Sequence, residues 1–393
     1  MSVTSSTPAV ASSAAAQEPA SKPRRSHWAR RLAIALVVAL AGGGGALAWG
    51  MHEQPSIPPV VWLQHPVQSF TFALGGNPHP VQLVLPPQQP LSAVAQLGRQ
   101  LFFDTALSAS GKQSCASCHD PANGYNPPPG SGPVMLGGPN MTSPGFRPPP
   151  SLAYLYRQQP FSIGPDNEEN ETITLQQLAA LGQTSQRAKK TAQSTARSVQ
   201  NLVPTGGLFW DGRVNTLQQQ AGGPLFNPVE MDAGTPQRVA AIIERQPYAK
   251  MFLQLFGPNV FADPKQTVSE ALFAIARYQI EDPQFHAFNS KYDAWLQGRA
   301  TLTSQEMRGY LAFNDVNKGD CAACHFDQPT KDHLPPLFTD TQYEALGVPR
   351  NPQIPANQNP HYFDIGLCGP FRTDLKNQTA YCGMFLTPTL RNV

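Results

Sequence analysis

Apolar residues recur at helical spacing in two segments that each precede a cysteine motif. In LSAVAQLGRQLFFD, residues 91–104, they fall on one stripe of a helix. In TLTSQEMRGYLAFND, residues 301–315, Thr303 and Glu306 form a capping box ahead of the apolar positions. The first stripe consists of Leu91, Val94, Leu97, Gly98, Leu101 and Phe102. Both segments are therefore predicted to be helices.

The region between these segments carries further helix signals. Thr235 is a predicted N-cap with Pro236 at the first helical position, and SEALFAIARYQ, residues 269–279, is typical of an amphipathic helix. Strand signals are sparse. The chain contains 41 prolines and 31 glycines, which predict long loops. These residues concentrate at 55–90, 120–165 and 349–370. The pattern predicts an all-α fold with long connections.

An uncharged hydrophobic run, LAIALVVALAGGGGALAWGM at 32–51, is long enough to cross a bilayer. It follows a basic, Ser/Ala/Pro-rich tail at 1–31 that is predicted to be disordered and to stay in the cytoplasm. Ala46-Leu47-Ala48 fits a signal-peptidase site, so the run is either a membrane anchor, which we favour slightly, or a cleaved signal. A buried core helix is disfavoured because the run has no polar face. The remainder is expected on the periplasmic side of the bacterial inner membrane, or in the periplasm after cleavage.

Composition narrows the class of protein further. The length of 393 residues allows two domains of ordinary size and a tail. The hydrophobic fraction of 40% is enough to form their cores. The formal net charge of +2 gives no indication of a polyanionic partner, so we expect no nucleic acid.

Four of the six cysteines lie in two copies of one pattern, CASCH at 115–119 and CAACH at 321–325. This is the attachment pattern of a c-type haem, in which two thiols bind the porphyrin and the adjacent histidine binds the iron. The predicted haem-binding residues are Cys115, Cys118, His119, Cys321, Cys324 and His325, with His119 and His325 as the iron ligands. A zinc site is disfavoured because the pairs are far apart in sequence, and a redox C-x-x-C because no βαβ pattern flanks either pair. We therefore predict two covalently bound haems.

The order of four motifs resembles the bacterial di-haem cytochrome c peroxidase and MauG superfamily. These are LGRQLFFDTALSASGKQSCASCHDP, LFWDGRVNTLQQQAGGPLFNPVEM, CAACH and FLTPTLRNV, and the resemblance covers about 90–393. It implies two cytochrome c-like helical haem domains. We expect a Pro-rich linker at 52–88, a peroxidatic domain at 89–298 and an electron-transfer domain at 299–393.

The resemblance also implies three catalytic residues. Trp210, in FWDGR, matches a tryptophan that relays electrons between the haems; on composition alone it is an ordinary core aromatic. Glu230 and Gln220 match a pair that lines the peroxide pocket, with Glu as acid/base and Gln holding the oxidant. Without the resemblance, Glu230 is better interpreted as a surface charge.

Two departures from the family affect the expected mechanism. No histidine lies between His119 and His286, whereas many family members rest with a second histidine on the peroxidatic iron. Arg187 stands near that position, so we predict a five-coordinate or water-bound first haem; Met135, Met141 and Met231 are weaker candidates for a sixth ligand. The long stretch 120–190 is expected to be a surface excursion.

The C-terminal region is the second departure. The family continues past LRNV, so the second domain is expected to be truncated, and its sixth iron ligand is left unassigned because Met384 is expected to pack. An interhaem calcium remains an open alternative, with Thr195 at one ligand position where the family has Asn. Cys368 and Cys382 are predicted to form a disulfide in an oxidising compartment, with two free thiols as the alternative.

Three functions follow from these expectations. The first is a peroxidase that reduces hydrogen peroxide with electrons from a small donor protein, a c-type cytochrome or cupredoxin, passed from the C-terminal to the N-terminal haem. The second is MauG-like oxidation of a partner protein or organic substrate by high-valent haem. The third is a di-haem electron carrier without catalysis, which Glu230 and Gln220 disfavour.

Overall fold

The computed structural model describes residues 45, 48, 65–165 and 202–392. The chain divides into two compact units, Met1–Leu74 and Gly75–Val393. No helix among the described residues is long and apolar enough to cross a membrane. The predicted tail at 1–31 and nearly all of the hydrophobic run at 32–51 lie outside the described residues.

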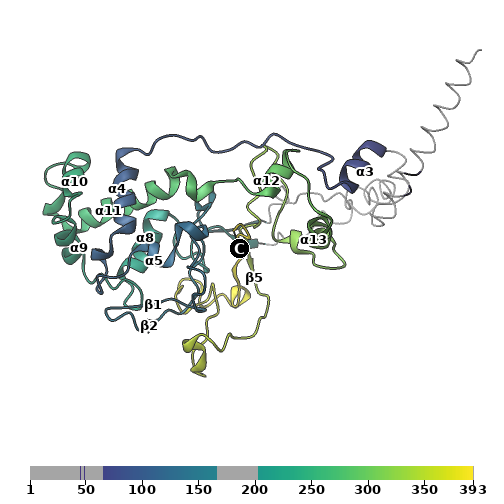
Figure 1. Ribbon diagram of the computed structural model, residues 1–393. Helices are drawn as coiled ribbons and strands as arrows, with labels where there is room; N and C mark the ends of the chain where they lie inside the picture. The colour runs from purple at the N-terminus through teal and green to yellow at the C-terminus, as the bar shows by residue number, and fades with distance from the viewer. Residues whose placement is uncertain (1–44, 46–47, 49–64, 166–201, 393) are drawn as a thin grey trace, which may run out of the picture. The chain divides into compact units, whose positions relative to one another are not determined.

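The described part of the chain is mostly helical with short strands (Figure 1). Its helices are α3 Pro66–Ala73, α4 Ala93–Phe103, α5 Cys115–Cys118, α8 Leu217–Phe226, α9 Pro236–Ile243, α10 Ala249–Phe256, α11 Pro264–Glu281, α12 Lys291–Leu296 and α13 Ser304–Asn314. Its strands are β1 Leu136–Gly137, β2 Ser143–Pro144, β3 Ser162–Pro165, β4 Leu202–Thr205, β5 Tyr343–Glu344 and β6 Phe385–Leu386.

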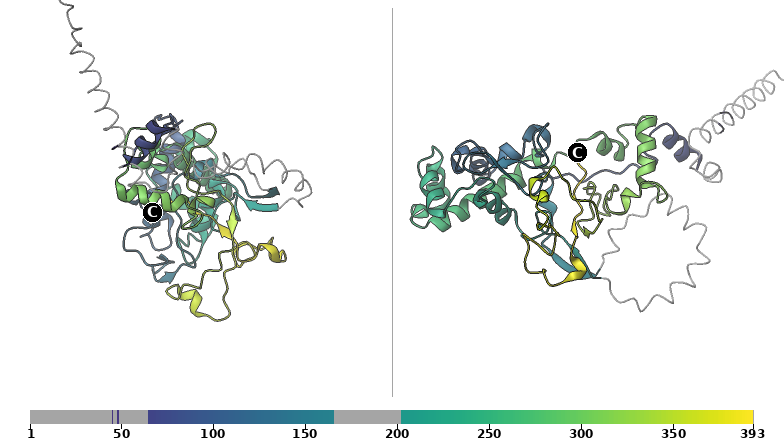
Figure 2. Two further views of the ribbon diagram at one scale, coloured as in Figure 1. Left: turned by 90° about the vertical axis from the view of Figure 1, so that its right-hand side faces the viewer. Right: turned by 90° about the horizontal axis from the view of Figure 1, so that it is seen from below.

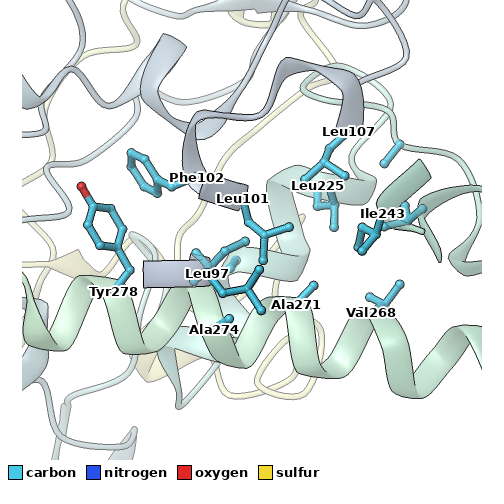
Figure 3. Packing of buried hydrophobic residues seen from close by; sticks show 14 of the residues in the cluster. Leu97, Leu101, Phe102, Leu107, Leu225, Ile243, Val268, Ala271, Ala274 and Tyr278 are labelled. Carbon is cyan, nitrogen blue, oxygen red and sulfur yellow. The ribbon is translucent and has the colours of Figure 1, made fainter. Parts of the chain in front are cut away.

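The main core forms where α4 crosses α11. The predicted stripe of α4 is buried at Leu97 and Leu101, and Figure 3 shows both side chains against Ala271 and Ala274 of α11. The two backbones approach so closely at Gly98 that a Cβ there would lie 1.8 Å from the Ala274 carbonyl oxygen. Glycine is therefore required at this position for the two helices to pack.

Helices α8, α9 and α10 complete this core around α11. Val239 and Ile243 of α9 and Phe252 of α10 are fully buried in it. The further views keep these teal and green helices together, so their proximity is not an overlap of one projection (Figure 2). The predicted N-cap is confirmed, because the Thr235 side chain accepts from the Arg238 N–H at the start of α9.

The all-α prediction did not include strands, whereas the described residues form three small antiparallel ladders, β1–β2, β3–β4 and β5–β6. In register, Leu136 pairs with Pro144 and Tyr343 with Leu386. Each strand has two to four residues, too few for the alternation of apolar and polar positions that predicts a strand. The sequence pattern therefore missed them.

The second motif lies beside a separate aromatic group. The predicted capping box is confirmed at the start of α13, where the Thr303 and Glu306 side chains each bond the other residue's N–H. Tyr292 and Trp295 of α12 stack, with ring centroids 5.4 Å apart, and Trp295 also contacts Tyr310 of α13. These contacts hold the two short helices together.

The structure modifies one detail of the predicted linker at 52–88. The helix α3 lies within this Pro-rich stretch. Residues 76–92, which follow it, form neither helix nor strand. The described unit from Gly75 onward contains both cysteine motifs. The boundary at 298/299 between two haem domains stays a prediction.

Candidate functional site

The first cysteine motif forms a single helical turn, α5. Ser117 Oγ accepts from the Ser114 N–H at 3.0 Å before the turn, and the His119 N–H donates to the Cys115 carbonyl at 3.0 Å after it. Cys115 and Cys118 are both free thiols. The turn therefore presents the two thiols and the imidazole from one short stretch of backbone.

Burial and one hydrogen bond fix the state of His119. Its Nδ1 lies 3.3 Å from the Tyr125 carbonyl oxygen, so Nδ1 carries the proton and Nε2 keeps its lone pair. Burial lowers the pKa of His119 to about 4, although the carbonyls of Tyr125 and Pro150 act in the opposite direction. Burial also raises the pKa of Cys115 to about 12 and raises that of Cys118. The imidazole and both thiols are neutral.

One cavity gathers the predicted site residues of the N-terminal region, and we call it the N-terminal cavity. Its volume is about 140 Å³. Its wall includes Cys115, Cys118, His119, Trp210, Gln220 and Glu230. Segments separated by about a hundred residues of sequence thus meet at one site.

Glu230 is a half-buried carboxyl on this wall. Its Oε1 accepts from Asn227 Nδ2 at 2.8 Å, and its carbonyl accepts from the Gly138 N–H at 2.7 Å. The neighbouring Gly137 is packed so tightly that a Cβ would come within 2.8 Å of the Glu230 Cα. Burial raises the pKa of Glu230, and this outweighs the bond from Asn227 and the charge of Arg213, which lower it. Glu230 therefore takes up a proton more readily than an exposed glutamate.

Gln220 reaches the same cavity from α8. Thr216 caps this helix, and Gln220, one turn later, is 7% exposed. After the helix, the chain turns back so that the Met231 N–H donates to the Pro224 carbonyl at 3.1 Å. This reversal brings Gln220 and Glu230 to one wall.

Trp210 lies in a tight loop between the cavity and β6. The loop is closed by the Leu208 N–H, which donates to the Val214 carbonyl at 2.8 Å. The indole Nε1 donates to the Pro148 carbonyl at 2.9 Å, while the Trp210 carbonyl accepts from the Leu386 N–H at 2.9 Å. Trp210 is therefore bonded to the cavity wall through its side chain and to the C-terminal region through its backbone.

A buried ionic network holds this loop. The Asp211 carboxylate is fully buried and accepts from Arg147 at 2.8 Å and from Arg213 at 2.8 and 3.0 Å. Arg147 also binds Asp364 through two bonds of 2.6 and 2.8 Å. The Asp211 carbonyl accepts from Arg372 at 2.9 Å. A buried carboxylate with several charged donors is strongly oriented, so the network fixes the backbone beside Trp210.

The second motif repeats the local geometry of the first. The His325 N–H donates to the Cys321 carbonyl at 2.8 Å, and His325 Nδ1 lies 2.8 Å from the Phe338 carbonyl oxygen. Cys321 and Cys324 are free thiols, and burial raises the pKa of Cys324. Nε2 again keeps its lone pair.

These residues fit the haem groups that the motifs imply. Each motif supplies two unpaired thiols and a histidine whose Nδ1 bonds a backbone carbonyl, which is the arrangement that leaves Nε2 for a metal. The side-chain oxygens of Gln113 and Gln279 line the N-terminal cavity and are buried without a hydrogen-bond partner among the described residues. Buried polar atoms are rarely left unpaired, so these two indicate a cavity that holds a further molecule.

The stretch 120–190 is more than the surface excursion predicted from sequence. Phe146, Arg147 and Pro148, in its described part, form wall of the N-terminal cavity. Its Pro/Gly-rich composition predicted a loop correctly but carried no information about its tertiary contacts. The acidic segment and Arg187 lie outside the described residues, as does Thr195.

Asn227, Gly137 and Arg147 were missed by sequence reasoning. The Asn-Pro dipeptide at 227–228 is a turn signal that predicts a reversal just before Glu230. Arg147 gives no such signal, because its partners are distant in sequence.

The methionines considered as ligands differ in position. Met135 and Met231 line the N-terminal cavity, whereas Met141 is not among its lining residues. Met384 packs against the cluster of Tyr343, Leu367 and Leu375, as predicted.

The predicted disulfide between Cys368 and Cys382 is confirmed, with the two Cα atoms 5.0 Å apart. Both cysteines belong to the region that carries Asp364 and Arg372 of the ionic network. The cross-link therefore restrains the loop that supports Trp210.

A mostly helical chain with two C-x-x-C-H turns, one of them beside a half-buried carboxyl, defines a di-haem oxidoreductase. The sequence model described as "Di-haem cytochrome c peroxidase" matches residues 92–301, and the chain belongs to this family. It is a peroxidase-like oxidoreductase, and the family implies two c-type haems.

Two curated relatives and one solved structure illustrate the similarity. The methylamine utilization protein MauG of Paracoccus denitrificans is 33% identical over 306 residues, 77% of this chain and 68% of the relative. The cytochrome c551 peroxidase of Nitrosomonas europaea is 28% identical, covering 78% of this chain and 70% of the relative. The crystal structure of the diheme peroxidase BthA from Burkholderia thailandensis aligns with a TM-score of 0.63 at 33% identity, covering 80% of this chain and 68% of that one.

Proposed function

We propose that this chain reduces hydrogen peroxide at the N-terminal cavity, with Glu230 as the acid/base. The observation that carries the proposal is the shared cavity wall of His119, Gln220 and Glu230. In this proposal Cys115 and Cys118 bind one haem and Cys321 and Cys324 the other. His119 and His325 would bind the iron of these haems. When bound, the haems supply redox-active iron, one for the oxidant and one for delivery of electrons.

The protein's own contribution is the handling of protons. Reduction of one peroxide to two waters consumes two electrons and two protons. A single carboxyl serves as base when peroxide loses its proton and as acid when the leaving oxygen needs one. Burial raises the pKa of Glu230, which favours donation of the proton to the leaving oxygen. The hydrogen bond from Asn227 lowers this pKa, so that part of Glu230 stays ionised and can accept the proton in the first step. The Gln220 amide offers a neutral donor and acceptor to hold the bound oxidant.

Trp210 is proposed as the electron relay between the two haem sites. Its support is the pair of hydrogen bonds to Pro148 and Leu386, which connect the cavity wall with the C-terminal region. The ionic network around Asp211 keeps the loop rigid, so the indole holds one orientation.

Oxidation of a protein or organic substrate is the second candidate function. Its support is the absence from the sequence of any histidine between His119 and His286, together with the relative named MauG. Electron paramagnetic resonance of the protein as isolated tests the first step. A high-spin ferric signal is expected for an open first site, and two low-spin signals would contradict it.

The electron donor and the location belong to the same proposal. We propose a small c-type cytochrome or cupredoxin as donor and a periplasmic site of action, with the hydrophobic run at 32–51 as anchor or signal. An interhaem calcium stays a prediction, because Thr195 lies outside the described residues.

Replacement of Glu230 by glutamine tests the central claim. E230Q should slow peroxide turnover by ~10²–10⁴-fold, because the amide cannot transfer the proton. The matched control is E244Q, which removes an exposed carboxyl at the end of α9 and should leave turnover unchanged. Equal rates in E230Q and E244Q, with two haems per chain in both, would remove Glu230 from the mechanism.

A further inference from the structure

The segment 387–392, which we call the bridging segment, contacts the loop that supports His325. Thr389 Oγ1 donates to the Leu337 carbonyl at 2.7 Å, and Arg391 Nε donates to the Pro336 carbonyl at 2.6 Å. The next carbonyl along that loop, from Phe338, accepts from His325 Nδ1 at 2.8 Å. Two side chains of the bridging segment therefore fix the backbone that orients this imidazole.

The end of the same segment contacts the loop that supports His119. Asn126 Nδ2 donates to the Asn392 carbonyl at 3.0 Å. The Asn392 side chain packs on Gly124, where a Cβ would lie only 2.9 Å from the Asn392 Cβ. Gly124 and Asn126 flank Tyr125, whose carbonyl is the partner of His119 Nδ1. The supports of both motif histidines thus meet at two successive residues, Arg391 and Asn392.

The Arg391 guanidinium contacts a carboxylate, a backbone carbonyl and two aromatic rings. Its guanidinium is 4% exposed and makes bonds of 2.8 and 3.0 Å to the carboxylate of Asp293, which is 1% exposed. It also lies over the rings of Phe288 and Phe338, at 4.7 and 5.6 Å from their centroids. Asp293 is itself fixed by a capping box with Ser290 at the start of α12. The guanidinium cannot shift without moving the loop that carries Phe338.

We propose that Arg391 and Asn392 are positioning residues for the two haem ligands, Arg391 for His325 and Asn392 for His119. The inference rests on the proposed ligation by these histidines. A partner on Nδ1 sets both the orientation of the imidazole and its basicity as a ligand, so moving that partner changes the reduction potential of the bound iron. The bridging segment therefore contacts the supports of both histidines through consecutive residues, each acting on one of them.

The test uses the full-length holoprotein and compares R391K with N392G. R391K keeps the charge but loses the planar fork that binds Pro336 and Asp293 together. It should change the equilibrium constant for reduction of the second haem about tenfold, which is ~59 mV for one electron, and leave the first haem unchanged. N392G, which removes the whole side chain that packs on Gly124, should do the reverse. The control is R308K, at an exposed position on α13.

Spectroelectrochemical titration, with each haem assigned by its paramagnetic resonance, gives the readout, and haem content per chain is measured on every sample. Unchanged potentials in R391K and N392G, or equal shifts of both haems in each variant, would overturn the inference. A wild-type protein without two haems would instead refute the proposed function. Where R391K fails to accumulate, D293N loosens the same guanidinium and should give the same selective shift of the second haem.

Discussion

Removal of the Asn227 amide measures how the protein sets the charge of Glu230. Asn227 Nδ2 donates to Glu230 Oε1 at 2.8 Å, and this bond stabilises the carboxylate against the pKa rise caused by burial. A hydrogen bond to a charged group contributes about 1.5–3 kcal/mol. Because Glu230 is half-buried and water can replace part of the lost bond, the lower figure applies. About 1.4 kcal/mol is a factor of ten, so N227A should lower the ratio of ionised to neutral Glu230 about tenfold.

The effect on turnover depends on pH with a defined sign. The first proton transfer needs the carboxylate, so kcat/KM for peroxide falls as pH drops through the pKa of Glu230. N227A raises that pKa further. The rate of N227A should therefore be about tenfold lower on the acidic limb and should approach the wild-type rate at higher pH. Stopped-flow measurement of kcat/KM across the acidic and neutral range gives the profile.

Two variants separate this effect from general damage. N259A removes an exposed asparagine beyond α10 and should reproduce the wild-type profile. E230Q should abolish the acidic limb altogether. A uniform loss of rate at all pH values in N227A, or an acidic limb at the wild-type position, would refute the role given to Asn227.

Four further outcomes are expected. W210F should slow electron transfer between the haems while peroxide binding, followed optically, stays at the wild-type affinity; equal transfer rates would exclude the relay. D211N should lower the free energy of unfolding by about 3 kcal/mol, because two partly buried arginines lose their fully buried carboxylate partner; an unchanged urea midpoint would contradict this. Paired replacement of Cys368 and Cys382 by serine should cost about 3 kcal/mol, since the cross-link closes a loop of 14 residues; a thermal midpoint equal to that of the wild type would argue against it. E230Q should stabilise the fold at neutral pH but not under acidic conditions, because a raised pKa in the folded state destabilises only above the unfolded pKa; equal stabilisation at both pH values would be inconsistent.

Local features of the fold followed from sequence. The stripe at 91–104, the N-cap at Thr235 and the capping box of Thr303 and Glu306 are each set within a few residues, and the structure contains all three. The two C-x-x-C-H turns are local in the same way. The disulfide was predictable because only two cysteines remained outside those motifs.

Features that depend on tertiary contacts did not follow from sequence. Trp210, Gln220 and Glu230 were identified only through resemblance, because nothing in their local sequence says that they share a cavity wall. The glycine of FWDGR is a clear case. Gly212 has a φ of +61°, and a Cβ there would lie 2.1 Å from the Tyr343 hydroxyl. A residue more than a hundred positions away therefore decides which amino acid the motif requires.

The contact of Gly98 with Ala274 has a consequence for the order of events during biosynthesis. The core against which Cys115 packs closes only when α11 meets α4, so that side of the first motif stays uncovered until residues near 281 have been made. At synthesis rates of about 5–20 residues per second, the intervening chain of roughly 160 residues takes about 8–30 s. We therefore expect the first motif to be most accessible for covalent maturation before the two helices dock.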